Sequence, residues 1–168
     1  MMTAPPAYLL DANIFIEAHK RYYAFDICPG YWTALLSHHN GAHLRSIDRV
    51  RDELISQADA LSQWIQQQVP ASFFAATGDR QVTEVFSNVV AWVQNKAQYL
   101  PAAKTAFAAG ADGWLVAYAR VHGLIVATDE VQNPGIRRRV PIPNVCDAFG
   151  VDCIDTFNML RALGARFH

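Results

Sequence analysis

The chain has 168 residues, of which 52% are hydrophobic and 17% charged, and its formal net charge is −1. This composition is typical of a globular protein and excludes a disordered chain or a nonspecific polycation, while a local basic patch stays compatible with nucleic-acid binding. The sequence has no segment like a secretory signal and no apolar run of the roughly 18 residues that span a membrane, so we expect a cytoplasmic, non-membrane protein with one domain over residues 1–168.

The first half of the chain alternates apolar runs with helical patterns. The apolar stripe of the longest pattern predicts a helix with Ser46 as its N-cap and Asp48 in its first turn, which either runs on to Pro70 or splits near Ala58. The predicted elements of this half are a buried strand over 7–10, a short helix over 12–19, a helix over 29–41, a strand over 42–47 and the long helix over 46–68.

The second half continues the alternation of helices and strands. Its predicted elements are helices over 80–96, 101–110 and 112–123, a strand over 124–129, a turn over 132–135, a strand over 151–154 and a helix over 155–164. Strands separated by helices indicate the α/β class, with a central parallel sheet covered by helices on both faces.

Two aspartates come directly after predicted buried strands. Asp11 follows the first strand, and Asp129 follows the strand of the second half. If both strands are central and parallel, both carboxylates emerge at the same edge of the sheet, where α/β proteins bind ligands. The simpler alternatives are that Asp11 caps the following helix and that Asp129 belongs to a turn.

Two further acids occupy distinctive positions. Asp112 begins a predicted helix, where an aspartate often serves only as a cap. Glu53 lies at the margin of an apolar stripe, from which its side chain can lean toward the sheet, although a glutamate there is often simply solvated.

Four short motifs that contain these acids resemble the acidic motifs of PIN-domain nucleases. They are "LLDAN" at 9–13, "VRDEL" at 50–54, "ADGWLVAYA" at 111–119 and "VATDE" at 126–130. The tail "IPNVCDAFGVDCID" at 142–155 is further similar to a group of PIN-like bacterial proteins. The resemblance covers most of the chain and implies a three-layer α/β/α PIN-like sandwich.

The resemblance also implies a function. Most bacterial members of such families are ribonuclease toxins of toxin–antitoxin pairs, similar to VapC. We therefore expect a metal-dependent endoribonuclease that hydrolyses RNA, is held by an antitoxin protein and uses Mg²⁺ or Mn²⁺. Related domains often pair, so a homodimer is compatible with this expectation.

Carried over residue by residue, the resemblance assigns the metal-binding and catalytic roles to Asp11, Glu53, Asp112 and Asp129. Clustered carboxylates repel one another, which raises at least one pKa, and a divalent cation with oxygen ligands relieves the repulsion. We expect Glu53 to orient or activate the attacking water.

Two polar neighbours of these acids complete the predicted site. We expect Asn13 to position Asp11 and Thr128 to position Asp129.

Two other features have alternative interpretations. The run Arg137, Arg138 and Arg139 follows Asp129 closely and predicts phosphate contacts with RNA, a solvated loop, or a docking site for an acidic partner. The aromatic residues between 22 and 32 predict either a platform for base stacking or packing in the core or an interface.

Two competing functions follow from the same residues. A non-catalytic PIN-like module that binds nucleic acid or a partner protein would keep the fold without the chemistry. A haloacid-dehalogenase-type phosphatase also begins with an aspartate after a strand, but it normally has a second aspartate two residues later, where this chain has Asn13.

Overall fold

A five-stranded parallel sheet forms the centre of the molecule. We describe residues 7–167 of a computed structural model of the chain. The strand order is β3-β2-β1-β4-β5, and each neighbouring pair is parallel. The strands are β1 (Tyr8–Leu10), β2 (Leu44–Ile47), β3 (Phe74–Ala75), β4 (Ile125–Ala127) and β5 (Cys153–Ile154). This arrangement confirms the predicted α/β class.

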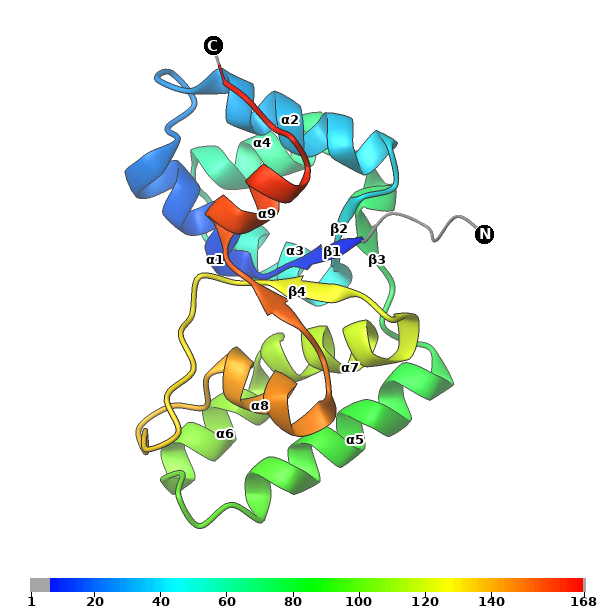
Figure 1. The fold of residues 1–168 in the computed structure, drawn as a ribbon, viewed down its shortest axis with the longest axis vertical. Helices are drawn as coiled ribbons and strands as arrows, with labels where there is room; N and C mark the ends of the chain where they lie inside the picture. The colour runs from blue at the N-terminus through cyan, green and yellow to red at the C-terminus, as the bar shows by residue number, and fades with distance from the viewer. Residues whose placement is uncertain (1–6, 168) are drawn as a thin grey trace.

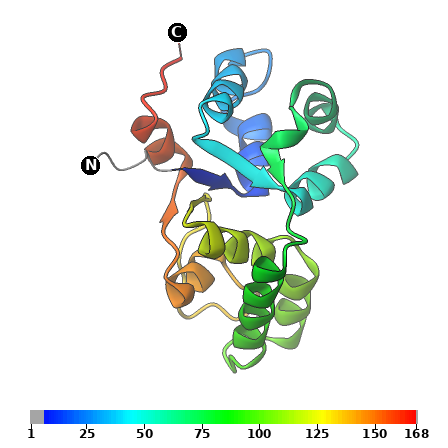
Figure 2. The same cartoon turned by 90° about the vertical axis from the view of Figure 1, so that its right-hand side faces the viewer.

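Helices cover both faces of the sheet, which gives three layers (Figure 1, Figure 2). One layer contains α1 (Ala12–Glu17), α2 (Pro29–Asn40), α3 (Asp48–Ser56), α4 (Ala60–Gln68) and α9 (Thr156–Ala162). The other contains α5 (Arg80–Gln94), α6 (Pro101–Ala109), α7 (Asp112–His122) and α8 (Ile142–Phe149). Because both faces are covered, β1 and β4 are apolar throughout, and Leu9, Leu10 and Val126 are fully buried. Within residues 7–167, no helix is long and apolar enough to cross a membrane.

The helix after β1 changes its winding. The α-helical part ends at Glu17, and a π-helical turn, η1 (Ala18–Tyr22), follows it. Short π-helical stretches are rare and often accompany functional sites. This turn carries Arg21 and Tyr22 toward the carboxyl edge of the sheet, where both residues line a cavity.

The long helical pattern over 46–68 forms two helices that are separated near Ala58. This confirms the second of the two predicted alternatives. Ala58 has a φ of 51°, and Asp59 caps the second helix by accepting a hydrogen bond of 2.9 Å from the Ser62 N–H. The predicted N-cap role of Ser46 is wrong. Ser46 lies in β2, and its hydroxyl donates to the Leu10 carbonyl at 2.6 Å, so the cap position falls to Ile47.

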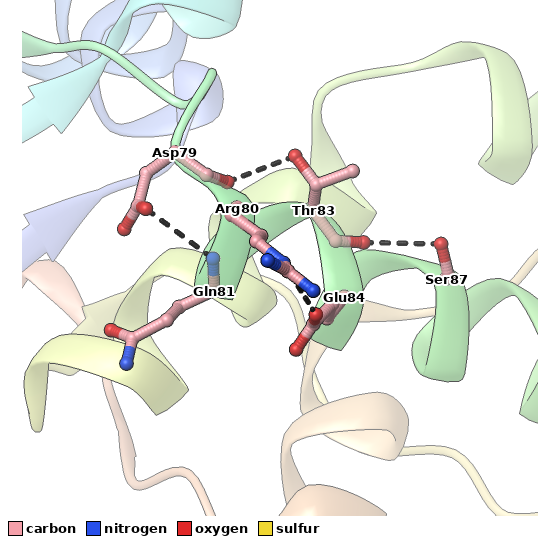
Figure 3. Close-up of polar contacts among 6 residues, drawn as sticks. All are labelled: Asp79, Arg80, Gln81, Thr83, Glu84 and Ser87. Atoms are coloured by element: carbon pink, nitrogen blue, oxygen red, sulfur yellow. Dashed lines mark hydrogen bonds and ion pairs between the residues drawn. The ribbon is translucent and has the colours of Figure 1, made fainter.

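The start of α5 shows how side chains fix a helix end in this chain (Figure 3). The Asp79 carboxylate accepts from the Gln81 N–H, and the Asp79 carbonyl accepts from both the N–H and the hydroxyl of Thr83. One turn further on, Arg80 and Glu84 form an ion pair at 3.2 Å. These bonds satisfy donors that a helix N-terminus leaves open, and the helix begins at Arg80 as predicted.

The sequence pattern predicts neither the strand β3 nor the helix α8. β3 has two residues and follows a 3₁₀ turn, so it is too short to show an alternating pattern. α8 begins between Pro141 and Pro143, which read as helix breakers but are tolerated in the first turn of a helix.

Candidate metal and nuclease site

The carboxyl ends of β1 and β4 lie side by side in the middle of the sheet. Leu10 pairs with Ala127, so the residues that follow them, Asp11 and Thr128, are also neighbours. β2 and β3 extend from one side of this pair and β5 from the other, so the strand order reverses here. Open α/β sheets bind ligands at such a switch point.

Asp11 is buried at this point, with 3% of its surface exposed. Its Oδ2 accepts a hydrogen bond of 2.9 Å from the Thr128 hydroxyl. Burial raises the pKa of Asp11 to about 6, and the charge of Glu53 adds to the rise, while the Thr128 hydroxyl and the N–H groups of Ala12 and Asn13 lower it. Asp11 is the N-cap residue of α1, and its carboxylate makes no hydrogen bond of ordinary capping geometry there, although the nearby Ala12 and Asn13 N–H groups favour its charged form.

Glu53 reaches from α3 to the start of α7. Its side chain is exposed, and its Oε1 accepts a hydrogen bond of 3.0 Å from the Ala111 N–H. This bond connects the two helices directly beside Asp112. Glu53 is therefore neither a freely solvated glutamate nor part of the core.

Asp112 is the first residue of α7 and makes no capping hydrogen bond there, because the cap position belongs to Ala111. Burial raises the pKa of Asp112 to about 7, and the charges of Asp11 and Glu53 raise it further, whereas Arg139 lowers it. The negative charges of neighbouring acids thus disfavour the ionised forms of Asp11 and Asp112.

Asp129 lies at the same edge of the sheet but points toward α9. Its carboxylate accepts a hydrogen bond of 3.0 Å from the Thr156 N–H and further bonds of 2.8 and 2.9 Å from the Thr156 hydroxyl. Asp129 is exposed and lines a cavity together with Asn13.

The two polar neighbours differ from their predicted roles. Thr128 donates to Asp11 rather than to Asp129, because Thr128, not Asp129, is the residue directly opposite Asp11 across the two strands. Within the described part of the chain, the Asn13 side chain has no hydrogen bond to Asp11 and lies in the wall of the cavity instead.

Sequence reasoning missed one acid, Glu130. Its side chain is only 8% exposed, it forms an ion pair with Arg139, and its Oε2 accepts a hydrogen bond of 2.8 Å from the Ile142 N–H. The sequence feature that points to Glu130 is its position in "TDE", where two acids follow a buried strand directly.

The three consecutive arginines are exposed and lie near the acids. Arg138 and Arg139 line a small cavity of about 210 Å³ together with Asp112. The Arg137 carbonyl accepts a hydrogen bond of 2.9 Å from the Leu100 N–H, which fixes this loop to the start of α6. Arg138 and Arg139 are thus placed where a phosphate beside the acid cluster could meet them.

The donor set suits a hard divalent cation. In the described residues, no three His, Cys, Asp or Glu side chains converge closely enough, as they stand, to hold a metal ion. Nevertheless, the charge of Glu53 raises the pKa of both Asp11 and Asp112, and all three side chains offer only oxygen ligands, which Mg²⁺ and Mn²⁺ prefer. The hydrogen bond with the Ala111 N–H occupies only Oε1 of Glu53.

A family model described as "Domain of unknown function (DUF4411)" matches residues 8–167, and the chain therefore belongs to that family. No curated protein matches the sequence. The structure is similar to the crystal structure of FitAcB from Neisseria gonorrhoeae, with a TM-score of 0.54 and 18% identity, over 88% of this chain and 96% of that chain. The likeness concerns the fold, and with the central parallel sheet it confirms the predicted PIN-like sandwich.

Proposed function

We propose that this DUF4411 protein is a metal-dependent endoribonuclease whose active site is centred on Asp11, Glu53 and Asp112. The observation that carries the proposal is that Asp11, Glu53 and Asp112, from three separate elements, lie near enough at the switch point of the sheet for the charge of Glu53 to raise the pKa of the other two. Two of them, Asp11 and Asp112, have raised pKa values because they are buried near like charge. Such groups at the ligand-binding edge of a sheet are candidates for function.

A divalent cation accounts for this costly arrangement. Asp11, Glu53 and Asp112 would hold Mg²⁺ or Mn²⁺, and Asp129 would join them by turning from Thr156. Such an ion, when bound, activates water and stabilises the negative charge that develops on a phosphodiester.

The chain's own residues have distinct tasks in this proposal. Thr128 holds Oδ2 of Asp11 and so fixes the orientation of that carboxylate. Glu53 is exposed, so it can reach and orient a water molecule. Arg138 and Arg139 stand beside Asp112 and can contact the phosphate.

We further propose that the protein is the toxin of a toxin–antitoxin pair, with an antitoxin protein as partner and with homodimerisation as an additional property. The support is the resemblance of its acidic motifs to those of VapC-like PIN nucleases, together with the shared fold class. Fold alone does not establish function.

One observation favours a second candidate, a non-catalytic PIN-like binding module. In the described residues the carboxylates do not converge as a ready metal cage, since Glu53 is bonded to Ala111 and Asp129 to Thr156. Among the functions considered, the phosphatase has the least support, because Asn13 stands where its second aspartate would be.

A cleavage assay separates the two leading candidates. Purified protein is mixed with total bacterial RNA in Mn²⁺, in Mg²⁺ or in chelator, beside Asp11→Asn, Asp112→Asn and the control Asp52→Asn, which alters an exposed acid next to Glu53 on α3. We expect metal-dependent cleavage that falls at least 100-fold in the two site variants and persists in the control. Equal cleavage by all four proteins would place the activity elsewhere, and intact RNA in every lane would favour the binding module.

A further inference from the structure

A cavity of about 550 Å³ opens beside the acid cluster at the same edge of the sheet. Its walls come from η1, from the loop after β4 and from the start of α9. Asn13, two residues after Asp11, and Asp129, the neighbour of Thr128, both line it. A ligand in this cavity would therefore lie directly next to the proposed reaction centre.

Two exposed aromatic rings form one side of the cavity. The exposed fractions of Tyr22 and Phe157 are 55% and 51%. Their ring centroids are 6.2 Å apart and the ring planes are inclined by 73°, an edge-to-face contact. The neighbouring Tyr31 and Trp32 are buried, so packing explains much of the aromatic cluster but not Tyr22. Exposed aromatic faces next to a cavity suit a planar ligand such as a nucleobase.

Two arginines line the cavity, and one of them also lies beside the acids. Arg139 lines both this cavity and the smaller cavity that contains Asp112. Arg21 lies in the wall contributed by η1 and pairs with Glu17 at 3.1 Å. A phosphate at Arg139 would thus lie between a base in the large cavity and the carboxylates.

Carboxylates outnumber these arginines in the cavity wall, and each has a partner within the protein. Asp129 accepts from Thr156, Asp155 caps α9 by accepting from Asn158, and Glu130 pairs with Arg139. Their remaining lone pairs make the wall rich in hydrogen-bond acceptors. Such a wall favours a base that carries an amino group over uracil, whose oxygens would face other acceptors.

We propose that this cavity is a subsite for one unpaired nucleotide of a single-stranded RNA, with its base stacked on the face of one of the two rings, Tyr22 or Phe157, beside the other ring, and with its phosphate toward Arg139. The inference rests on the proposed ribonuclease function and names its substrate class. A base paired within a duplex cannot enter the cavity, so the subsite selects single strands and prefers the bases with an amino group, adenine, cytosine and guanine, to uracil.

Binding in chelator tests the subsite without any cleavage. Fluorescein-labelled 12-nucleotide RNAs of adenylate, cytidylate or uridylate, and a mixed-sequence RNA as single strand or duplex, are titrated with protein and followed by anisotropy. The variants are Tyr22→Leu and Phe157→Leu, which keep an apolar side chain but lose the ring, with Tyr22→Phe and Phe157→Tyr as conservative partners. Ile27→Ala, which changes a residue that is 79% exposed and lies outside the cavity, is the control.

We expect single-stranded RNA to bind more tightly than duplex, and uridylate to bind most weakly. At least one of the two leucine variants should weaken single-strand binding by about 5- to 150-fold, the range for loss of one base–aromatic stack, while the conservative variants and the control stay near wild type. Unchanged binding in both leucine variants, equal affinity for single strand and duplex, or tightest binding of uridylate would each overturn the subsite as proposed.

The outcomes also separate the subsite from the nuclease proposal. If the wild type binds RNA as expected but metal brings no cleavage, the nuclease proposal fails and the subsite stands. If the wild type cleaves RNA with metal and the leucine variants bind and cleave equally well, the subsite fails and the nuclease proposal stands.

Discussion

The carboxyl group of Asp11 is deeply buried. Its protonation therefore affects the free energy of unfolding of the protein. Its pKa rises from the usual 3.8 to about 6 in the folded protein because burial disfavours the charged form. The folded state then binds the proton more tightly than the unfolded chain does. The resulting stabilisation is present below pH 4 and is lost as the pH rises through about 6. The pKa of Asp112 is raised to about 7, so Asp112 also contributes stability at low pH that is lost as the pH rises through about 7.

This linkage predicts a pH-dependent stability of the metal-free protein. A pKa rise from 3.8 to about 6 corresponds to roughly 3 kcal/mol of unfolding free energy lost between pH 4 and pH 8. Asp11→Asn should remove that part of the loss and be the more stable protein at pH 8. Urea unfolding in chelator from pH 4 to 8 measures the difference, with Asp52→Asn as the control. A pH slope in Asp11→Asn equal to that of the wild type would contradict the account.

Single residues of the site were predictable to different degrees. Asp11 and Asp112 could be found because each occupies a position, after a strand or at a helix start, that the sequence pattern marks. The partners of Thr128 and Asp129 could not, because side-chain directions at the strand ends decide them. Glu130 was not predictable for the same reason, because only its ion pair with Arg139 distinguishes it from an ordinary acid in a loop.

At the scale of elements, the break between α3 and α4 places Glu53 near the end of a short helix. Ala58 forms this break with a φ of 51°, a left-handed conformation that alanine adopts at a cost and glycine adopts freely. The apolar stripe continues across the break. The sequence therefore allowed either one helix or two, and the backbone at Ala58 decides for two.

Ala58→Gly should stabilise the protein by roughly 0.5–1 kcal/mol, because glycine removes the strain of the positive φ. The matched change Ala91→Gly, at an exposed position inside α5, should destabilise it by about 1 kcal/mol. Thermal and urea unfolding of the two variants at pH 5 measure both effects. Destabilisation of similar size in both variants would show that Ala58 is not held in the left-handed conformation.

At the scale of the whole molecule, the alternation of strands and helices was enough to predict a parallel sheet covered on both faces. The strand order was not available from periodicity, because packing of helices against the sheet decides which strands become neighbours. That order places β1 between β2 and β4, and so Asp11, at the end of β1, lies near α3, which follows β2, and near the start of α7, which precedes β4. The nearness of Asp11, Glu53 and Asp112 depends on both of these adjacencies.

The central claim is that Asp11, Glu53 and Asp112 form one divalent-cation site. Titration calorimetry with Mn²⁺ at pH 8, where the carboxylates are ionised, tests it most directly in the wild type, Asp11→Asn, Glu53→Gln, Asp112→Asn and the control Asp52→Asn. We expect the wild type and the control to bind Mn²⁺ with equal affinity, and each site variant to bind at least tenfold more weakly. Mn²⁺ binding that is absent from the wild type, or is unchanged in all three site variants, would contradict the account.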